Sequence, residues 1–297
     1  MSLIVSIIVP TKDRGPAVES LLDSIKCLEG LRRIRPEIIV GDNDSRDNTW
    51  HLLCAASQDF PVPLTRVKVE VPGKSAVVNS ALRLAKGKVL AFIDDDVTLD
   101  PRWLEALERF FSHGAYQVGQ GRILLQEPDA TDPEVKKLNK RFRTIPHLEL
   151  EDPSTRLHSL NGANFAVRRE ALERVGHFDE RLGPGASGTS EDVELARRFI
   201  RAGIHIGYMQ EAVAYHRVDR ARLTEEYFKC IHKKQGKSRL LIKDRSVPHI
   251  MFQLCRTATQ YGINSVLAKD RKRYRSKGRV YHYLGMLEAK WNGQADR

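Results

Sequence analysis

Residues 89–100, VLAFIDDDVTLD, join an apolar run to three consecutive aspartates. The run Val89–Ile93 has the composition of a strand that is buried on both faces of a parallel sheet. Asp94, Asp95 and Asp96 follow directly, and adjacent carboxylates repel one another unless a cation neutralises them. Hard oxygen ligands suit Mg²⁺ or Mn²⁺, and carboxylates at positions i and i+2 can converge on one ion. A solvated acidic turn is the alternative interpretation of the same residues.

This stretch lies in a repeating pattern of apolar strands and amphipathic helices. "LIVSIIV" (3–9) is apolar and β-branched, whereas "AVESLLDSIKCLEG" (17–30) has apolar residues at helical spacing. The alternation continues over about the first 115 residues and predicts a parallel sheet that helices cover on both faces. Such sheets bind ligands beyond the carboxyl ends of their strands, where Asp42 and the three aspartates fall. The other elements expected here are a strand within 36–45 and helices at 75–87 and 101–114.

The second half of the chain is less regular. Residues 127–156 are rich in proline and charge, and we expect a mobile loop there. Beyond residue 220 the alternation stops, and amphipathic helices are expected near 223–243 and 248–268, followed by the basic cluster "KDRKRYRSKGR" (269–279). The elements expected between these regions are strands at 118–126 and 205–216, and helices at 169–175 and from about Ser190.

Two polar loops follow the first two strands at the same edge as the aspartates. "IIVGDNDSRDNT" (38–49) offers Asp42 or Asn43 to the edge of a nucleobase, or forms an Asx-rich turn that caps the next helix. "VPTKDR" (9–14) is the second loop, and its alternative role is entry into a helix. The sequence therefore predicts a ligand site at this edge of the sheet.

A further pair of acids opens a helix after a glycine-rich loop. Glu191 and Asp192 in "GTSEDVELARR" (188–198) are typical of capping, because acids are favoured in the first turn of a helix. A carboxylate at such a junction can also face a cleft and act as a general base. His216 ends a strand, where it is either structural or a further ligand of a metal ion or a diphosphate.

Length and composition limit the class of protein. A chain of 297 residues with 41% hydrophobic residues can bury one large α/β domain, alone or with an appendage. No apolar run reaches the roughly 18 residues of a membrane-spanning helix, and the apolar start is interpreted as a strand because Pro10 interrupts it. The cysteines form neither a zinc motif nor a disulfide framework, which indicates a reducing cytoplasm. They are Cys27, Cys54, Cys230 and Cys255.

The positive charge is concentrated at the C-terminal end. Residues 221–297 contain 18 Lys and Arg against 6 Asp and Glu, whereas the preceding 220 residues contain 31 and 32. We therefore predict a main domain over 1–220 and a helical basic extension over 221–297. The extension has three interpretations: a face that packs on the main domain or is solvated, an interfacial helix at an anionic membrane, or a surface that tracks nucleic-acid phosphates.

Taken in order, these motifs resemble the successive blocks of one family. The resemblance is to family 2 glycosyltransferases with the GT-A fold, covers about residues 3–218, and rests on the order and spacing of the blocks as well as their content. It implies a mixed, mostly parallel Rossmann-like sheet flanked by helices. The blocks are "SIIVPTKDR", "IIVGDNDSRDNT", "GKSAVVNSALRLAKG", "VLAFIDDDVTLDPRWL", "NGANFAVRREALERVGHFDERL" and "SEDVELARRFIRAG".

The resemblance also implies roles for individual residues. Asp96 would hold a divalent metal ion, with Asp94 and His216 as further ligands, and Asp94 or Asp95 would contact the ribose or the donor sugar. Asp192 matches the catalytic base of the family. Many members have Asp-Asp where this sequence has Asp-Asn, so either residue could meet the nucleobase. The other matching positions are Pro10, Thr11, Asp42 and Asn43 in the nucleoside pocket, Lys74 and Asn79 near the diphosphate, and Gly162, Ala163 and Glu191 beside the donor sugar and acceptor.

The activity that the resemblance implies is transfer of a sugar from a UDP- or GDP-type donor to an acceptor hydroxyl, with inversion and with Mn²⁺ or Mg²⁺ as cofactor. The acceptor would be a glycan or lipid-linked molecule of the cell envelope, met in the cytoplasm or at the inner face of the membrane. A sugar-nucleotide nucleotidyltransferase is one alternative, although no Gly-rich, Arg-containing N-terminal loop is present. A nucleic-acid binder is another, but the acid motifs at 94–96 and 191–192 would then have no function. Intact Asp96 and Asp192 argue against a catalytically silent scaffold.

Overall fold

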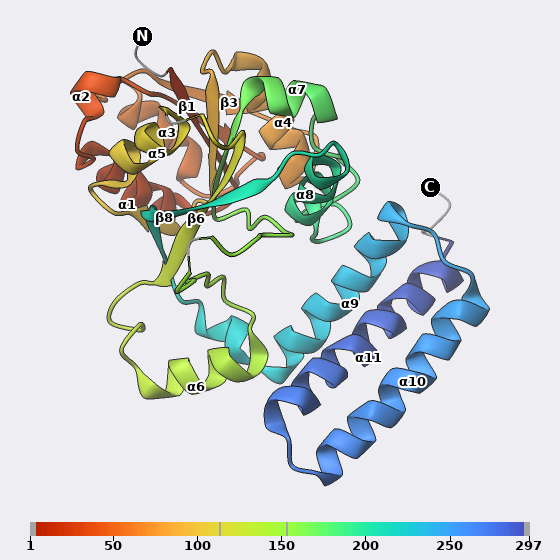
Figure 1. Ribbon diagram of the computed structural model, residues 1–297. Coiled ribbons are helices and arrows are strands. Elements are labelled where there is room, and N and C mark those ends of the chain that lie inside the picture. The colour runs from red at the N-terminus through yellow and green to blue at the C-terminus, as the bar shows by residue number, and fades with distance from the viewer. Residues whose placement is uncertain (1–3, 113, 153, 294–297) are drawn as a thin grey trace. The chain divides into compact units, whose positions relative to one another are not determined.

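The computed structural model describes residues 4–112, 114–152 and 154–293, and the chain divides into two compact units (Figure 1). We call them the sheet unit and the helical unit. The sheet unit comprises Met1–Gln126, Pro146–Glu180 and Glu191–Arg217, and the helical unit comprises Glu127–Ile145, Arg181–Ser190 and Val218–Arg297. Each unit is formed from more than one stretch of the chain.

The sheet unit is built on one eight-stranded sheet with the strand order β3-β2-β1-β4-β7-β6-β8-β5. The first four of these strands are parallel, β7 is antiparallel to both of its neighbours, and β5 is antiparallel to β8. The sheet is therefore mixed and mostly parallel, as the resemblance implied. The strands are β1 (Val5–Thr11), β2 (Glu37–Asp42), β3 (Leu64–Lys68), β4 (Val89–Ile93), β5 (Val97–Leu99), β6 (Val118–Leu125), β7 (Asn164–Arg168) and β8 (Ile206–His216).

Helices cover both faces of this sheet, because alternate residues of its central strands are apolar on each side. In β1, Ile7 and Val9 belong to one core and Ile8 to the other. Helices α1, α3 and α5 contribute to the first core, and α4, α7 and α8 to the second. The helices of this unit are α1 (Gly15–Lys26), α2 (Leu31–Ile34), α3 (Thr49–Ala56), α4 (Lys74–Leu84), α5 (Trp103–Ser112), α7 (Arg169–Val175) and α8 (Glu191–Arg201).

Several strands end or begin at one edge of the sheet. Thr11 at the end of β1 pairs with Asp42 at the end of parallel β2. The neighbouring parallel strand β4 ends at Ile93, which pairs with Asn164, the first residue of antiparallel β7. The loops after β1, β2 and β4 and the loop before β7 therefore meet at this edge, which is where sheets of this kind bind ligands.

The helical unit consists mainly of three long helices, α9 (Glu225–Ile242), α10 (Val247–Val266) and α11 (Asp270–Trp291). Helix α11 packs against both α9 and α10 and lies between them (Figure 1). A small core joins the three helices at one end, and an aromatic cluster that includes Phe142, the last residue of α6 (Pro133–Phe142), joins α9 and α11 elsewhere. None of the helices in the described residues is both long and apolar enough to cross a membrane.

Two expectations about this unit differ from the structure. The segment expected to be a mobile loop contains a helix, α6 (Pro133–Phe142), because the Asp132 carboxylate accepts hydrogen bonds from the amides of its first turn and Pro133 suits that turn. A short 3₁₀ helix, η1 (Arg220–Leu223), precedes α9. The basic cluster at 269–279 opens a third long helix, α11, where only two were expected.

Candidate functional site

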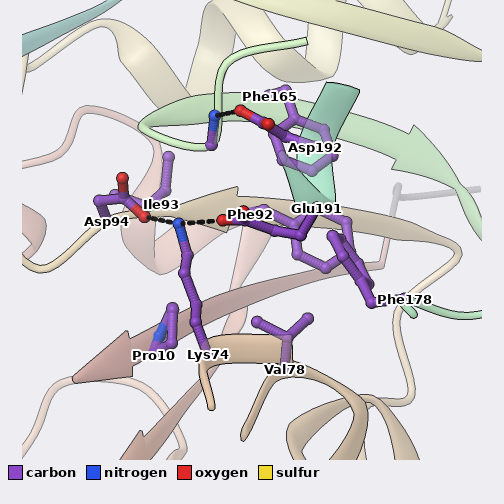
Figure 2. Close-up of a pocket in the computed structure, with 11 residues that line it drawn as sticks. Pro10, Lys74, Val78, Phe92, Ile93, Asp94, Phe165, Phe178, Glu191 and Asp192 are labelled. Atoms are coloured by element: carbon purple, nitrogen blue, oxygen red, sulfur yellow. Dashed lines mark hydrogen bonds and ion pairs between the residues drawn. The ribbon is translucent and has the colours of Figure 1, made fainter. Parts of the chain in front are cut away.

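Asp94, the first aspartate of the triplet, is joined to two other parts of the sheet unit through Lys74. Lys74 is the first residue of α4, and its Nζ lies 2.5 Å from Asp94 Oδ1 and 3.3 Å from Glu191 Oε1 (Figure 2). Burial disfavours the ammonium, but the two carboxylates outweigh burial and raise the pKa of Lys74. Lys74 therefore stays charged and connects the acid at the end of β4 to the acid pair that opens α8.

Asp192, the second acid of that pair, is held by backbone amides. The amide of Gly162 donates to Asp192 Oδ2 over 2.9 Å, and the amide of Val193 donates to Oδ1 over 2.7 Å. Burial and the negative charge of Glu191 raise the pKa of Asp192 to about 7, while Lys74 and the two amides act in the opposite direction. A carboxylate with a pKa near neutrality is well matched to accepting a proton.

Gly162 permits the close approach of these groups. A Cβ at this position would lie 2.8 Å from Lys74 Nζ, 3.7 Å from Asp94 Oδ1 and 3.8 Å from Asp192 Oδ2. Any side chain here would displace the Lys74 ammonium from its two ion pairs. The next residue, Ala163, is fully buried and leads into β7. The loop before β7 is therefore part of the site through its backbone.

These groups line a single pocket in the sheet unit (Figure 2). Its polar lining includes Asp94 from the end of β4 and Asp192 from the start of α8, so two acid motifs far apart in the sequence share one cavity. Its apolar wall consists of side chains from α4, β4 and β7 together with Phe178. The full lining is Pro10, Lys74, Val78, Phe92, Ile93, Asp94, Gly162, Phe165, Phe178, Glu191 and Asp192.

Asp95, the second aspartate, is tied to the loop after β1. The Thr11 hydroxyl donates to Asp95 Oδ2 over 2.7 Å, and Arg14 Nη1 lies 3.4 Å from Oδ1. Burial raises the pKa of Asp95 to about 7, against the opposing charge of Arg14 and with that of Asp96. The buried carboxylate and the Thr11 hydroxyl therefore fix the β1 loop beside the acid triplet.

Asp96, the third aspartate, has one cationic and one imidazole neighbour. Arg14 Nη1 lies 2.7 Å from Asp96 Oδ2, and His216 Nε2 lies 3.2 Å from Oδ1. His216 is almost fully buried, and its Nδ1 donates to the Arg217 carbonyl over 2.7 Å because a carbonyl can only accept. In the neutral ring Nε2 would thus present a lone pair to the carboxylate.

A carboxylate oxygen and an imidazole lone pair that face each other are a donor set that Mn²⁺ or Mg²⁺ can use, and Mn²⁺ accepts nitrogen more readily. Asp96 and His216 therefore fit a divalent ion. Asp94, the third expected ligand, is not beside them, because Lys74 holds its carboxylate. Among the described residues, no three His, Cys, Asp or Glu side chains converge where one ion could lie. The three predicted ligands are therefore not together, because Asp94 pairs with Lys74 and Asp96 pairs with Arg14.

Asp42 and Asn43, the residues expected at the nucleobase, already have protein partners. Asp42 is fully buried, and its carboxylate accepts from the amide and hydroxyl of Ser45. The side-chain amide of Asn43 donates to the carbonyls of Val69 and Val71, and its oxygen accepts from the amide of Gly73. Asn43 thereby fixes the connection from β3 to α4, and Lys74, the first residue of α4, directly follows this connection.

Asn79, which was expected near the diphosphate, is likewise occupied. Its Nδ2 donates to the Phe178 carbonyl and to Glu180 Oε1, each over 2.9 Å, and its Oδ1 accepts from the Phe178 amide over 3.1 Å. Phe178 lines the pocket. In this structure Asn79 therefore supports the pocket wall through the segment that carries Phe178.

Arg14 belongs to the site but was not singled out from the sequence. Its guanidinium contacts two of the three aspartates, and these carboxylates raise its pKa although burial opposes the charge. A signal was present, because "VPTKDR" was placed at the same sheet edge as the acid triplet. A cation in a loop that adjoins three carboxylates is the expected counter-charge.

The fold is that of the GT-A glycosyltransferases. The structure superimposes on a mannosyltransferase from Pyrobaculum calidifontis, PcManGT, solved in complex with GDP-Man and Mn²⁺, with a TM-score of 0.67, 18% identity, and coverage of 98% of this chain and 88% of the other. It also matches TarS 1–349 of S. aureus in complex with UDP-GlcNAc, with a TM-score of 0.57, 14% identity, and coverage of 98% and 92%. At these identities the likeness shows the fold.

Residues 6–176 match the family model described as Glycosyl transferase family 2. The chain belongs to this family. One relative is the glycosyltransferase AglE of Haloferax volcanii, which is 22% identical over 212 residues that cover 71% of this chain and 66% of the relative. The chain spans between 16% and 66% of the length of the first curated relatives that it matches. The family match and the fold favour neither the nucleotidyltransferase nor the nucleic-acid binder.

Proposed function

We propose that the chain transfers a sugar from a nucleoside-diphosphate sugar to an acceptor hydroxyl with inversion, and that Asp192 is the catalytic base. The strongest support is that Asp94 and Asp192 line the same pocket although they come from separate motifs. A donor that contacts Asp94 and an acceptor that contacts Asp192 would therefore lie side by side. Lys74, which pairs with both Asp94 and Glu191, would supply positive charge near the diphosphate.

The nucleoside would lie over the ends of β1 and β2. Pro10 lines the pocket, and Thr11, Asp42 and Asn43 follow at the adjoining strand ends. The Asn43 amide contacts three backbone groups of the connection to α4, whereas the Asp42 carboxylate accepts from a single residue, Ser45, so we favour Asp42 for contact with the base. GDP-Man and UDP-GlcNAc in the two structural neighbours make guanine and uracil the first bases to test.

Asp96 and His216 would hold the divalent ion, with Asp94 as a further ligand once its carboxylate leaves Lys74. The bound ion would act as a Lewis acid towards the diphosphate. Arg14 and Lys74 lie beside the same acids and would balance their charge while the nucleotide is exchanged. The protein thus keeps a cation next to each aspartate of the triplet.

In the transfer step, Asp192 would take the proton of the acceptor hydroxyl while the hydroxyl oxygen bonds to the anomeric carbon. The bond from that carbon to the diphosphate oxygen breaks, and its electron pair leaves with the nucleoside diphosphate. Attack from the face opposite the leaving group inverts the configuration. General-base assistance of this kind contributes about 10²–10⁴-fold to the rate. The pKa of Asp192 near 7 suits this role.

The acceptor in this proposal is a glycan or lipid-linked molecule of the cell envelope, and the enzyme works in the cytoplasm or at the inner face of the membrane. Support comes from the concentration of positive charge beyond residue 220, which favours an anionic surface over a neutral one.

Calorimetry with GDP and with UDP, each with and without Mn²⁺, tests the donor half of the proposal. The wild type should bind one of the two nucleotides more tightly with Mn²⁺. Asp96→Ala should lose about tenfold or more of that affinity, a loss typical of a removed metal ligand. Asp44→Ala is the matched control, because Asp44 is an exposed acid of the same unit that pairs with Lys68. An affinity that Asp96→Ala leaves unchanged would contradict the assignment.

A further inference from the structure

We infer that the outer face of α10 docks on the surface of an anionic phospholipid bilayer. This α10 face is defined by five exposed apolar residues, which are Met251, Phe252, Ile263, Val266 and Leu267. The inference deepens the proposed function, because it names the surface from which a lipid-linked acceptor would be reached. It is derived from the helical unit alone, and its tests do not use sugar transfer.

Helix α10 departs from the residue distribution of an ordinary surface helix. Its buried side includes Thr257 and Asn264, which are 2% and 8% exposed, whereas Ile263 and Val266 are 54% and 86% exposed. In a water-soluble bundle the apolar residues are expected to face the neighbouring helix and the polar ones to face water. The structure instead satisfies Thr257 and Asn264 with internal hydrogen bonds and leaves large aliphatic groups outside.

The exposed apolar side chains are concentrated here. Of the eleven large hydrophobic residues that are exposed in the described part of the chain, six lie between Val247 and Leu267. Single exposed hydrophobic residues are normal on protein surfaces, but their concentration on one helix points to an interaction site. Phe252 is 65% exposed, so an aromatic ring belongs to the group.

Helical geometry places three residues of the α10 face on one stripe. At about 100° per residue, Phe252, Ile263 and Val266 fall within roughly 60° of one another around the helix axis. Phe252 and Val266 are separated by about 21 Å along that axis at 1.5 Å per residue. A stripe of this length lies along a flat surface, as interfacial helices do, and does not insert end-on.

The charges around the stripe are complementary to an anionic surface. Residues 247–266 contain no Asp or Glu. Arg271 and Lys272, just beyond Leu267, are exposed, and no described carboxylate forms an ion pair with either of them. Cations beside an exposed apolar stripe, with no acid in the stripe, are the composition of a helix that binds anionic lipid headgroups.

The packing of the helical unit leaves this stripe available within the unit. Helix α11 lies between α9 and α10, so α10 has a long-helix neighbour along one side (Figure 1). Ile250, Thr257 and Asn264 face that side and are buried, and the five residues of the α10 face lie on other sides of the helix.

Two other occupants fit the charges less well. A second copy of the chain would bring two basic helical units together, and like charges repel. A nucleic acid would use the cations but has no contact to offer Ile263, Val266 and Leu267, because single-strand binding relies on aromatic stacking. An anionic bilayer satisfies both the apolar stripe and the cations.

Vesicle co-sedimentation tests the inference. The full chain should sediment with vesicles of phosphatidylcholine that contain about one third phosphatidylglycerol, and much less with pure phosphatidylcholine. Phe252→Ser combined with Val266→Ser should weaken binding about 10- to 100-fold, since both side chains lose their burial in the lipid. Arg271→Gln combined with Lys272→Gln should weaken it about tenfold.

Matched controls come from the other unit. Val71 and Leu84 are exposed hydrophobic residues of the sheet unit, and Arg32 and Lys88 are exposed cations there. Val71→Ser with Leu84→Ser, and Arg32→Gln with Lys88→Gln, should sediment like the wild type. Nucleotide binding should be unchanged in the α10 variants, so a failure of docking is distinguishable from a failure of the donor site.

A label on Cys255 gives a second measurement that leaves the five apolar residues of the α10 face unchanged. Cys255 is an exposed residue of α10, and Cys27 is an exposed residue of α1's C-terminal end. With the other cysteines changed to Ser, an environment-sensitive fluorophore on Cys255 should shift to the blue on anionic vesicles, and one on Cys27 should not.

Three outcomes would overturn the inference. One is equal sedimentation of the wild type and the Phe252→Ser, Val266→Ser variant. Another is a wild-type dimer, seen by light scattering, that this variant converts to a monomer, because the face would then belong to a second copy. The third is a salt-sensitive gel shift with RNA or DNA that the same variant abolishes while vesicles fail to bind.

Discussion

The pocket of the sheet unit and the outer face of α10 both depart from the ordinary distribution of residues, but in opposite directions. The pocket encloses carboxylates, among them Glu191, which is 7% exposed. The α10 face exposes aliphatic groups, among them Val266. Burying charge and exposing apolar surface both cost free energy in water. Each departure therefore indicates a place where something other than water is expected to bind.

The two regions also differ in how their polar groups are satisfied. In the sheet unit each buried carboxylate of the site has a cation, hydroxyl or amide within hydrogen-bonding distance, so the arrangement is fixed before any ligand arrives. The residues of the α10 face are apolar side chains that form no hydrogen bonds, and the flanking cations Arg271 and Lys272 are exposed. Preorganised charge suits chemistry on a small ligand, whereas an apolar stripe without fixed polar contacts suits the broad surface of a lipid bilayer.

The largest effect should come from the base. Asp192→Asn keeps the size of the side chain but cannot take a proton, so transfer should fall by about 10²–10⁴-fold. Affinity for the nucleoside diphosphate should change little. Single-turnover kinetics and calorimetry on the same preparation measure the two effects. Asp44→Asn is the control, and full transfer by the Asp192→Asn variant would remove Asp192 from the mechanism.

This substitution has a thermodynamic signature as well. A carboxyl whose pKa is raised on folding binds more protons in the native state, so its contribution lowers the stability as the pH rises from about 4 towards 7. Asp192→Asn removes that cost. The variant should have a higher Tm than the wild type at pH 8 and a similar Tm at pH 4. A lower Tm at pH 8 would indicate that the charge of Asp192 stabilises the fold.

Much of this fold follows from the sequence because its signals are local. The apolar runs at 5–9 and 89–93 have the composition of buried strands, and parallel strands place their carboxyl ends at one edge. The acid motifs and their meeting at that edge were therefore predictable. The strand order, with antiparallel β7 inserted between β4 and β6, depends on contacts between distant segments that no local pattern encodes.

The roles of the two amides were not predictable for a different reason. Asn43 and Asn79 stand beside the expected ligand positions, and a side-chain amide offers the same donors and acceptor to a ligand as to a backbone. Only the structure shows that both amides contact backbone groups. Likewise, a helix that reads as basic and polar at 269–279 gives no sign that α11 would be the central helix of its unit.

The next largest effect should be a difference in stability loss between the sheet unit and the helical unit when one buried asparagine of each is removed. Asn79→Ala leaves the Phe178 backbone groups and the Glu180 carboxylate unpaired, which should destabilise the sheet unit by about 3 kcal/mol. Asn264→Ala removes two longer contacts, of 3.3 and 3.4 Å, and should cost about 1 kcal/mol or less. Hydrogen exchange, read separately for peptides of each unit, measures both. Equal losses would contradict the view that only the sheet unit is preorganised.

A smaller effect is expected from the cation of the pocket. Lys74→Gln leaves Asp94 and Glu191 without their shared ammonium, and repulsion among the carboxylates should weaken nucleoside diphosphate binding by about 10- to 30-fold. Isothermal titration with and without Mn²⁺ provides the test. Lys68→Gln, at an exposed ion pair of the same unit, is the control. Tighter binding by Lys74→Gln would contradict this expectation, because the release of Asp94 to the metal ion would then outweigh the lost positive charge beside the diphosphate.

The smallest effect, a shift in pH dependence, discriminates most finely. The base must be deprotonated, so kcat/KM should rise with pH and level off above about 7, the pKa of Asp192. Glu191→Gln removes a negative charge that raises this pKa, so the rise should move to lower pH. Glu194→Gln, three residues after Glu191 on α8 and paired with Arg198, should leave the rise in place. If the rise moved to higher pH in Glu191→Gln instead, the charge of Glu191 would not be what raises the pKa of Asp192, and the prediction would be wrong.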